Sequence, residues 1–323
     1  MNFLISVIVI GCSFATNLAQ SPIETIFQWE YIDYDWPSQA EREEALRNGS
    51  YDPIKVIPND VDVSQDGRIF ITLKFDEATP ARLGYVTIFD DSIGALIRPY
   101  PSWSWYQTQD CDSILAPVRM VTDKCNRLWT VDSGFRPTNP DQCNPKIIAF
   151  DLTTNTLIEK IVIPDDIAKG SSAKYVSISN IKIEESGEDC ENPTIYMNDV
   201  ASNSLIIWRE NQLFRLENSR FRQLPKKTNN ANARSASNWI SLFDAEIIAD
   251  EDERLENTSG MKIKIDPFTG DEQLWILTYR PQSFSANKVR IDEMKYYILR
   301  ASVEELVSNS TKCRRPSMMG RIV

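Results

Sequence analysis

The residue types that this chain lacks restrict its chemistry as much as those it carries. Its 323 residues include no histidine, which excludes Ser-His-Asp and Cys-His relays, histidine-ligated zinc and haem with a histidine ligand. Proton transfer would depend on carboxylates, lysine, tyrosine, cysteine or serine, or on a bound cofactor. We expect no catalytic residue, no metal and no cofactor, and a non-catalytic role is the first hypothesis.

Two aspartates stand where strands are expected to end. Asp132 lies in Val-Asp-Ser-Gly and Asp199 in Met-Asn-Asp-Val. In the mouth of a channel, such carboxylates could pair with the ammonium group of a ligand. The alternative is that each carboxylate caps a turn by accepting hydrogen bonds from its own backbone, which is the more common role. The sequence leaves both interpretations open.

The beginning of the chain predicts export. Residues 3–10 form an apolar run that is followed by small residues, which is typical of a secretory leader. The run is too short to span a bilayer, and its alternative is a core strand. We predict a leader over residues 1–19 and a secreted, extracellular protein. Three sequons, at Asn48, Asn257 and Asn309, fit a glycoprotein.

The charge balance limits the partners. The chain has 35 Lys+Arg and 46 Asp+Glu, a net charge of −11. An acidic protein is not attracted to phosphate backbones or to anionic lipid surfaces. We therefore expect a small-molecule ligand rather than nucleic acid or membrane.

A strand pattern recurs four times and predicts an all-β fold. Each copy has an apolar strand, a polar turn and an apolar-aromatic pair that opens a second strand, and a third strand follows. The pairs begin at Ile69, Leu128, Ile195 and Leu274. Four-stranded units that recur at this scale are typical of a β-propeller, because each blade buries its faces against its neighbours. A β-sandwich is the alternative.

Two short helices and one break interrupt the strands. Ser38 as a cap with Glu41 three residues later predicts a helix over Ser38–Asn48, and a second is expected over Ser302–Ser308. Residues 225–236 are polar and without period, which indicates a loop or linker.

Strand order also predicts the disulfides. Six cysteines are present, and the leader would remove the first, Cys12. Cys111 and Cys143 should lie at one end of a blade, while Cys125 and Cys190 should lie at the opposite end of adjacent blades. Of the three pairings that four cysteines allow, this topology favours Cys111–Cys143 and Cys125–Cys190. Cys313 is left over.

Several long motifs resemble the yellow/major royal jelly protein family of insects. They include Trp29-Glu-Tyr-Ile-Asp-Tyr-Asp-Trp36, Arg98-Pro-Tyr-Pro-Ser-Trp103, the segments 125–134 and 143–152, and Ser259-Gly-Met-Lys-Ile263. The resemblance covers about residues 27–224 and 238–313. It implies a six-bladed propeller secreted from the cell. It also implies that most of one blade and part of another are missing near residues 222–238, which leaves about four recognisable blades in a single domain over residues 20–323.

The resemblance implies several functions. Some relatives bind biogenic amines in the central channel, others are associated with dopachrome conversion in melanin chemistry, and royal jelly members are food proteins that also bind lipids. The ligand positions carried over are Tyr85, Tyr279 and Arg280. Departures from the family pattern at Tyr279 and Pro281, and Arg82 in place of a small polar residue, predict weak amine binding.

Three hypotheses follow. The favoured one is a secreted, non-catalytic protein that binds a small ligand, an amine or a lipid, or serves as food. The second is a dopachrome-converting enzyme. The third is an impaired, shortened paralogue, whose missing middle could be a real deletion, a splice form or an error in the gene model. Incomplete closure would also favour self-association, because open strand edges pair readily.

Overall fold

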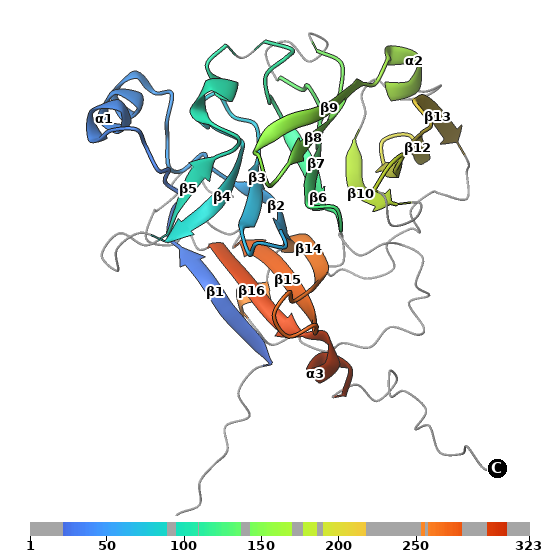
Figure 1. The fold of residues 1–323 in the computed structure, drawn as a ribbon. Coiled ribbons are helices and arrows are strands. Elements are labelled where there is room, and N and C mark those ends of the chain that lie inside the picture. The colour runs from blue at the N-terminus through green and yellow to red at the C-terminus, as the bar shows by residue number, and fades with distance from the viewer. Residues whose placement is uncertain are drawn as a thin grey trace, which may run out of the picture.

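The computed structural model describes residues 22–88, 95–108, 110–136, 143–169, 177–185, 190–217, 253–255, 258–279 and 296–308. Within them lie four antiparallel sheets of four strands each. Figure 1 shows these sheets as successive blades along an arc, so the predicted propeller with about four recognisable blades is confirmed.

Three of the sheets follow the chain order. Sheet B contains β2 (Pro58–Val63), β3 (Ile69–Leu73), β4 (Leu83–Ile88) and β5 (Ala95–Pro99). Sheet C contains β6 (Pro117–Thr122), β7 (Arg127–Asp132), β8 (Lys146–Asp151) and β9 (Thr156–Val162). Sheet D contains β10 (Ile178–Glu184), β11 (Thr194–Asp199), β12 (Ser204–Arg209) and β13 (Gln212–Glu217).

The remaining blade joins the two ends of the described chain. Sheet A has the order β1-β16-β15-β14, with β14 (Thr258–Ile265), β15 (Glu272–Tyr279), β16 (Tyr296–Ser302) and β1 (Ile23–Trp29). Ile23 lies opposite Ala301, and Trp29 lies opposite Tyr296. The sequence pattern did not predict this pairing, which fastens the start of the chain to its last blade.

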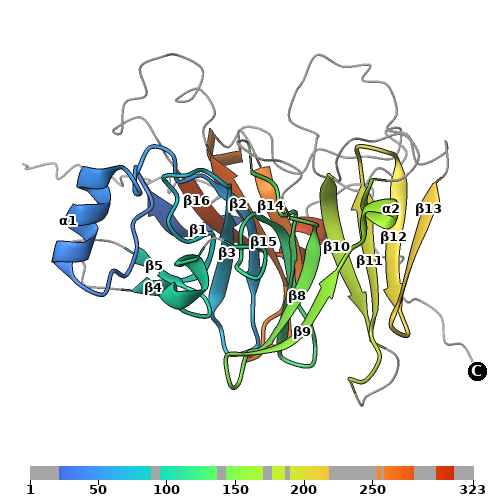
Figure 2. The same cartoon turned by 90° about the horizontal axis from the view of Figure 1, so that it is seen from above.

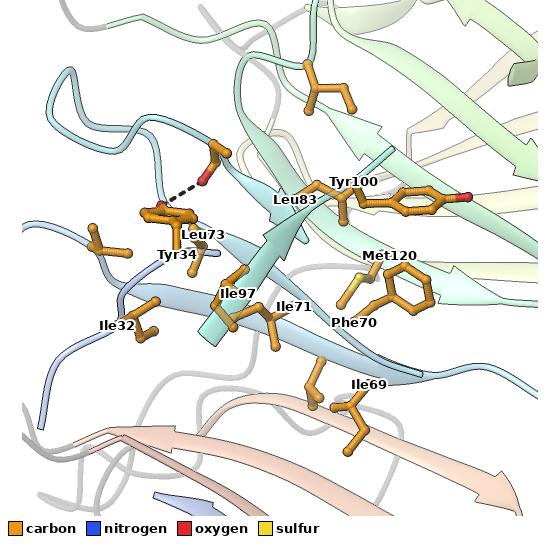
Figure 3. Close-up of a cluster of buried hydrophobic side chains, with 14 of the residues drawn as sticks. Ile32, Tyr34, Ile69, Phe70, Ile71, Leu73, Leu83, Ile97, Tyr100 and Met120 are labelled. Carbon is orange, nitrogen blue, oxygen red and sulfur yellow. Dashed lines mark hydrogen bonds between the residues drawn. The ribbon is translucent and has the colours of Figure 1, made fainter. Parts of the chain in front are cut away.

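One strand of each sheet lies closest to the axis around which the blades are arranged: β14, β2, β6 and β10. β14 packs beside β2, β2 beside β6, and β6 beside β10 (Figures 1 and 2). Alternating apolar residues point between sheets and form the core. Figure 3 shows one such cluster, in which Met120 of sheet C lies beside Phe70 of sheet B. A second cluster, with Trp129 and Trp208, fills the space between sheets C and D.

The segment before sheet B covers the edge of its outer strand. Tyr34 bridges to Ile97 of β5, and the Asp35 N–H donates to the Ile97 carbonyl at 2.9 Å. The Tyr34 hydroxyl donates to the Ala81 carbonyl at 2.8 Å, which fixes the segment against the sheet. This contact satisfies backbone groups that an open edge would expose.

The helices are short. They are α1 (Gln39–Asn48), α2 (Asp165–Ala168) and α3 (Val303–Ser308), with 3₁₀ turns at Trp103–Tyr106 and Glu253–Leu255. Both helices predicted from the sequence are confirmed to within one residue, whereas α2 was not predicted. None of the helices in the described residues is long and apolar enough to cross a membrane.

Replacing Ser38 by alanine is expected to lower the free energy of unfolding by about 1 kcal/mol. The Ser38 hydroxyl accepts a hydrogen bond from the Glu41 N–H at 3.2 Å, and alanine would leave this N–H without its partner. Urea unfolding measures the difference, and Ser38→Asp is the control because it keeps an acceptor. Equal losses of stability in both variants would show that a hydrogen-bond acceptor at position 38 does not stabilise α1.

Candidate functional site

Asp132, at the end of β7, is fully buried among donors of the chain. Its carboxylate accepts hydrogen bonds from the N–H groups of Leu115 at 2.7 Å, Ala116 at 2.8 Å and Gly134 at 2.9 Å. Lys146 Nζ at the start of β8 lies 3.0 Å from the same carboxylate. Asp132 therefore ties the connection that enters sheet C to the end of β7.

Asp199 has the equivalent position at the end of β11 and a similar set of donors. It accepts from the Ser177 and Ala201 N–H groups at 2.9 and 3.0 Å and from the Ser202 hydroxyl at 2.6 Å. Arg215 Nη2 of β13 lies 2.7 Å away. This geometry matches the turn-capping alternative for both aspartates, because donors of the chain itself surround each buried carboxylate.

The other predicted ligand residues do not converge on these aspartates. Tyr85 lies in β4, where its ring contacts Phe70 of β3 and is 5.7 Å from the Arg68 guanidinium. Tyr279 ends β15, and its hydroxyl lies 3.4 Å from Lys74 Nζ. Arg280 falls outside the described residues.

Ion pairs between the innermost strands occupy the axis of the blades. Lys262 and Lys264 of β14 pair with Asp60 and Asp62 of β2 at 3.3 and 3.0 Å. Burial raises the pKa of Asp62 above its ordinary value, while the nearby lysines oppose this shift. With Arg119 of β6, this axis holds three cations against two carboxylates. A ligand cation therefore finds no net attraction there.

Arg119 connects all four sheets. Its Nε donates to the Ser179 carbonyl of β10 at 2.8 Å, and its Nη1 donates to the carbonyls of Asn59 in β2 at 3.1 Å and Ser259 in β14 at 2.8 Å. Nη1 also lies 3.8 Å from the Asp60 carboxylate. The described part of the central channel is thus a structural polar network.

A groove of 320 Å³ opens between sheets C and D, at the strand ends opposite Asp132 and Asp199. Trp129 and Trp208, which are only 3% and 7% exposed, reach this groove from the core between the two sheets. The remaining lining residues come from β7, β9, the β10–β11 connection and the β12–β13 turn: Arg127, Ile158, Glu159, Cys190, Glu191, Asn192, Pro193 and Asn211.

Hydrogen bonds of Asp123 and Arg127 hold the Trp129 side of the groove in place. Asp123 Oδ2 accepts from Trp129 Nε1 at 2.8 Å and from Arg127 Nε at 2.6 Å. Arg127 also donates to the Cys190 carbonyl at 2.8 Å and lies over the Trp129 ring at 5.2 Å. The arginine charge is therefore neutralised within the wall.

Two carboxylates of the groove differ from Asp132 and Asp199. Glu159 and Glu191 make no hydrogen bond or ion pair within the described residues. Unpaired carboxylates beside indole rings suit a ligand that has an ammonium group on an aromatic or apolar body. The sequence did not predict this site, because its residues come from separate strands and turns of two blades. The acidic and aromatic residues around Cys190 were its only local signal.

Both predicted disulfides are present. Cys111 and Cys143 have a Cα–Cα distance of 5.3 Å, and Cys125 and Cys190 one of 5.9 Å. The second bond holds the β10–β11 connection, and hence the groove, to sheet C. It also means that Cys125, although clustered with Asp123 and Glu185, offers no thiolate to a metal.

The predicted modification sites are only partly within the described residues. Asn48 is exposed at the end of α1, and its Oδ1 accepts from the Ser50 N–H at 2.9 Å. Asn257, Asn309, Cys313 and the leader over residues 1–19 lie outside, as does the region around residues 222–238. Glycosylation, export and the internal deletion remain predictions.

Comparison with known proteins identifies major royal jelly proteins among the relatives of this chain. The family model "Major royal jelly protein" matches residues 115–243 and 243–313. Major royal jelly protein 3 of Apis mellifera is 32% identical over 216 residues, which are 66% of this chain and 39% of the relative. Major royal jelly protein 2 of the same species is 30% identical over 232 residues, 69% of this chain and 51% of the relative. The chain thus spans about half the length of these relatives, or less.

Proposed function

Because the chain belongs to the major royal jelly protein family, we propose that it is a secreted, non-catalytic protein that binds a small aromatic amine in the groove between sheets C and D. The observation that carries this proposal is the pairing of two indole rings with the unpartnered carboxylates Glu159 and Glu191. The two disulfides are consistent with an oxidising, extracellular environment.

The electrostatics favour the groove over the channel as the place for a cation. Asp132 and Asp199 are neutralised by Lys146 and Arg215, and the axis holds more cations than carboxylates. In the groove, the one described cation is paired with Asp123, so the two glutamates leave a net negative charge. A ring on Trp208 with its ammonium near a glutamate would satisfy both parts of such a ligand.

The hydrogen bonds of Asp132 and Asp199 also make these residues unsuitable for proton transfer at the channel mouth. A general base needs a lone pair that can reach a substrate proton. In Asp132 and Asp199 the lone pairs already accept from chain donors. We therefore propose a binding role rather than dopachrome conversion.

Calorimetric titration with tyramine is expected to give measurable binding to the wild-type protein and about ten-fold weaker binding to Glu159→Gln/Glu191→Gln. One lost charge-assisted hydrogen bond is worth about 1.5–3 kcal/mol in a desolvated site, and solvent reduces this value in an open groove. The neutral phenol 4-ethylphenol should bind weakly and equally to both proteins.

Glu304→Gln, on α3 and away from the groove, is the matched charge control and should bind tyramine as the wild type does. Undiminished affinity in the double variant would refute the groove as the site. Absence of heat with tyramine, serotonin and dopamine would refute amine binding and leave the food-protein role. Dopachrome consumption faster than in buffer would instead support the enzymatic alternative.

A further inference from the structure

Arg82 is a fully buried cation with incomplete partners. It immediately precedes β4 and is 0% exposed. Asp132, at the end of β7 in the neighbouring blade, is among the charged groups that act on it. Arg82 Nη2 donates to the Asp76 carbonyl at 3.2 Å, and its guanidinium lies 4.5 Å from the Phe75 ring centroid. Its Nε and Nη1 are buried without any hydrogen-bond partner.

No carboxylate of the described residues neutralises this arginine. Asp132 is within electrostatic range, but Lys146 and three N–H groups already occupy it. The Asp76 carboxylate lies 3.7 Å from Lys55. A second cation, Arg136, also acts on Arg82, so the surroundings add positive charge.

The neighbouring hydroxyl groups are committed elsewhere. Tyr34 donates to the Ala81 carbonyl at 2.8 Å. Tyr106 approaches the carbonyls of Leu83 and Tyr100 at 2.9 and 2.7 Å. Neither hydroxyl is a hydrogen-bond partner of Arg82, and neither can supply a counter-charge at neutral pH.

An unpaired buried charge is costly to folding, so such groups are normally paired. Burial lowers the pKa of Arg82, but arginine stays protonated at neutral pH. We propose that Arg82 binds a small monovalent anion, a halide or a small carboxylate, between sheets B and C through its Nε and Nη1 groups. The bound anion supplies the counter-charge that the chain lacks, and this site is separate from the groove between sheets C and D.

Thermal unfolding in increasing sodium bromide or sodium acetate tests the proposal. The midpoint of the wild-type protein should rise by about 5–10 °C when the anion reaches a hundred times its dissociation constant. Arg82→Met keeps the length of the side chain without its charge and should lack this specific rise. At the lowest salt, it should be at least as stable as the wild type.

Arg98→Met is the matched control, because Arg98 is exposed and pairs with Asp35 at 2.6 Å. It should keep the anion response, which separates binding at Arg82 from general salt effects. A response to bromide alone identifies a halide site, and a response to acetate alone identifies a carboxylate site; either result supports the proposal. Parallel curves for wild type and Arg82→Met in both salts would overturn it.

Crystals of the wild-type protein give a readout that does not depend on the variant folding. After soaking, bromide should appear as an anomalous peak, or acetate as density, within hydrogen-bond distance of Arg82 Nε or Nη1. A site that stays empty in both soaks at saturating salt would refute anion binding.

Discussion

Replacing Arg119 by methionine should lower the free energy of unfolding by about 3–5 kcal/mol, because removing one member of a buried charge network leaves the other groups unsatisfied. The Arg119 side chain is 19% exposed and donates to carbonyls of three other blades. Its loss would leave those three carbonyls without their donor. Equilibrium unfolding in urea, monitored by tryptophan fluorescence, measures the change.

Arg98→Met controls for the loss of an arginine as such. Arg98 is 47% exposed and forms a surface pair with Asp35, so its removal should cost no more than about 1 kcal/mol. Arg119→Lys should lie between the two, because it keeps the charge but not the fork of donors. Similar losses in Arg119→Met and Arg98→Met would show that the blades do not depend on the axial network.

Removing the Cys125–Cys190 bond should cost about 4 kcal/mol. This bond closes a separation of 65 residues, and the entropy that a crosslink removes from the unfolded chain grows with the length of the loop. The double variant Cys125→Ser/Cys190→Ser, unfolded in urea beside the wild type, gives the value. It should also weaken ligand binding, because Cys190 lines the groove.

The Cys111–Cys143 bond provides the comparison. Its separation is 32 residues, so Cys111→Ser/Cys143→Ser should lose slightly less, about 3.5 kcal/mol. Peptide mapping without reduction should recover the two predicted pairs. A Cys111–Cys125 peptide, or no loss of stability in either double variant, would contradict the assignment.

Local pattern was sufficient for the repeated part of the fold. Strand alternation placed the apolar-aromatic pairs at Ile69, Leu128, Ile195 and Leu274, and all four begin or lie within a second strand of a blade. Strand direction then gave the disulfides, because it decides which cysteines share an end of a blade. The cap at Ser38 predicted α1 for the same local reason.

Long-range pairing was not predictable in this way. β1 completes sheet A across most of the chain, and no local feature of Ile23–Trp29 names its partner β16. The roles of Asp132 and Asp199 depend on Lys146 and Arg215, which only the folded sheet brings near. The groove was not predictable for the same reason, because Glu159 and Glu191 come from different blades.

The position of the bound amine tests the central claim most directly. In crystals soaked with tyramine, we predict density for the ring against Trp129 or Trp208, with the ammonium group near Glu159 or Glu191. Density at the channel mouth beside Asp132 and Asp199, or an empty groove at a tyramine concentration that saturates binding in solution, would contradict the account.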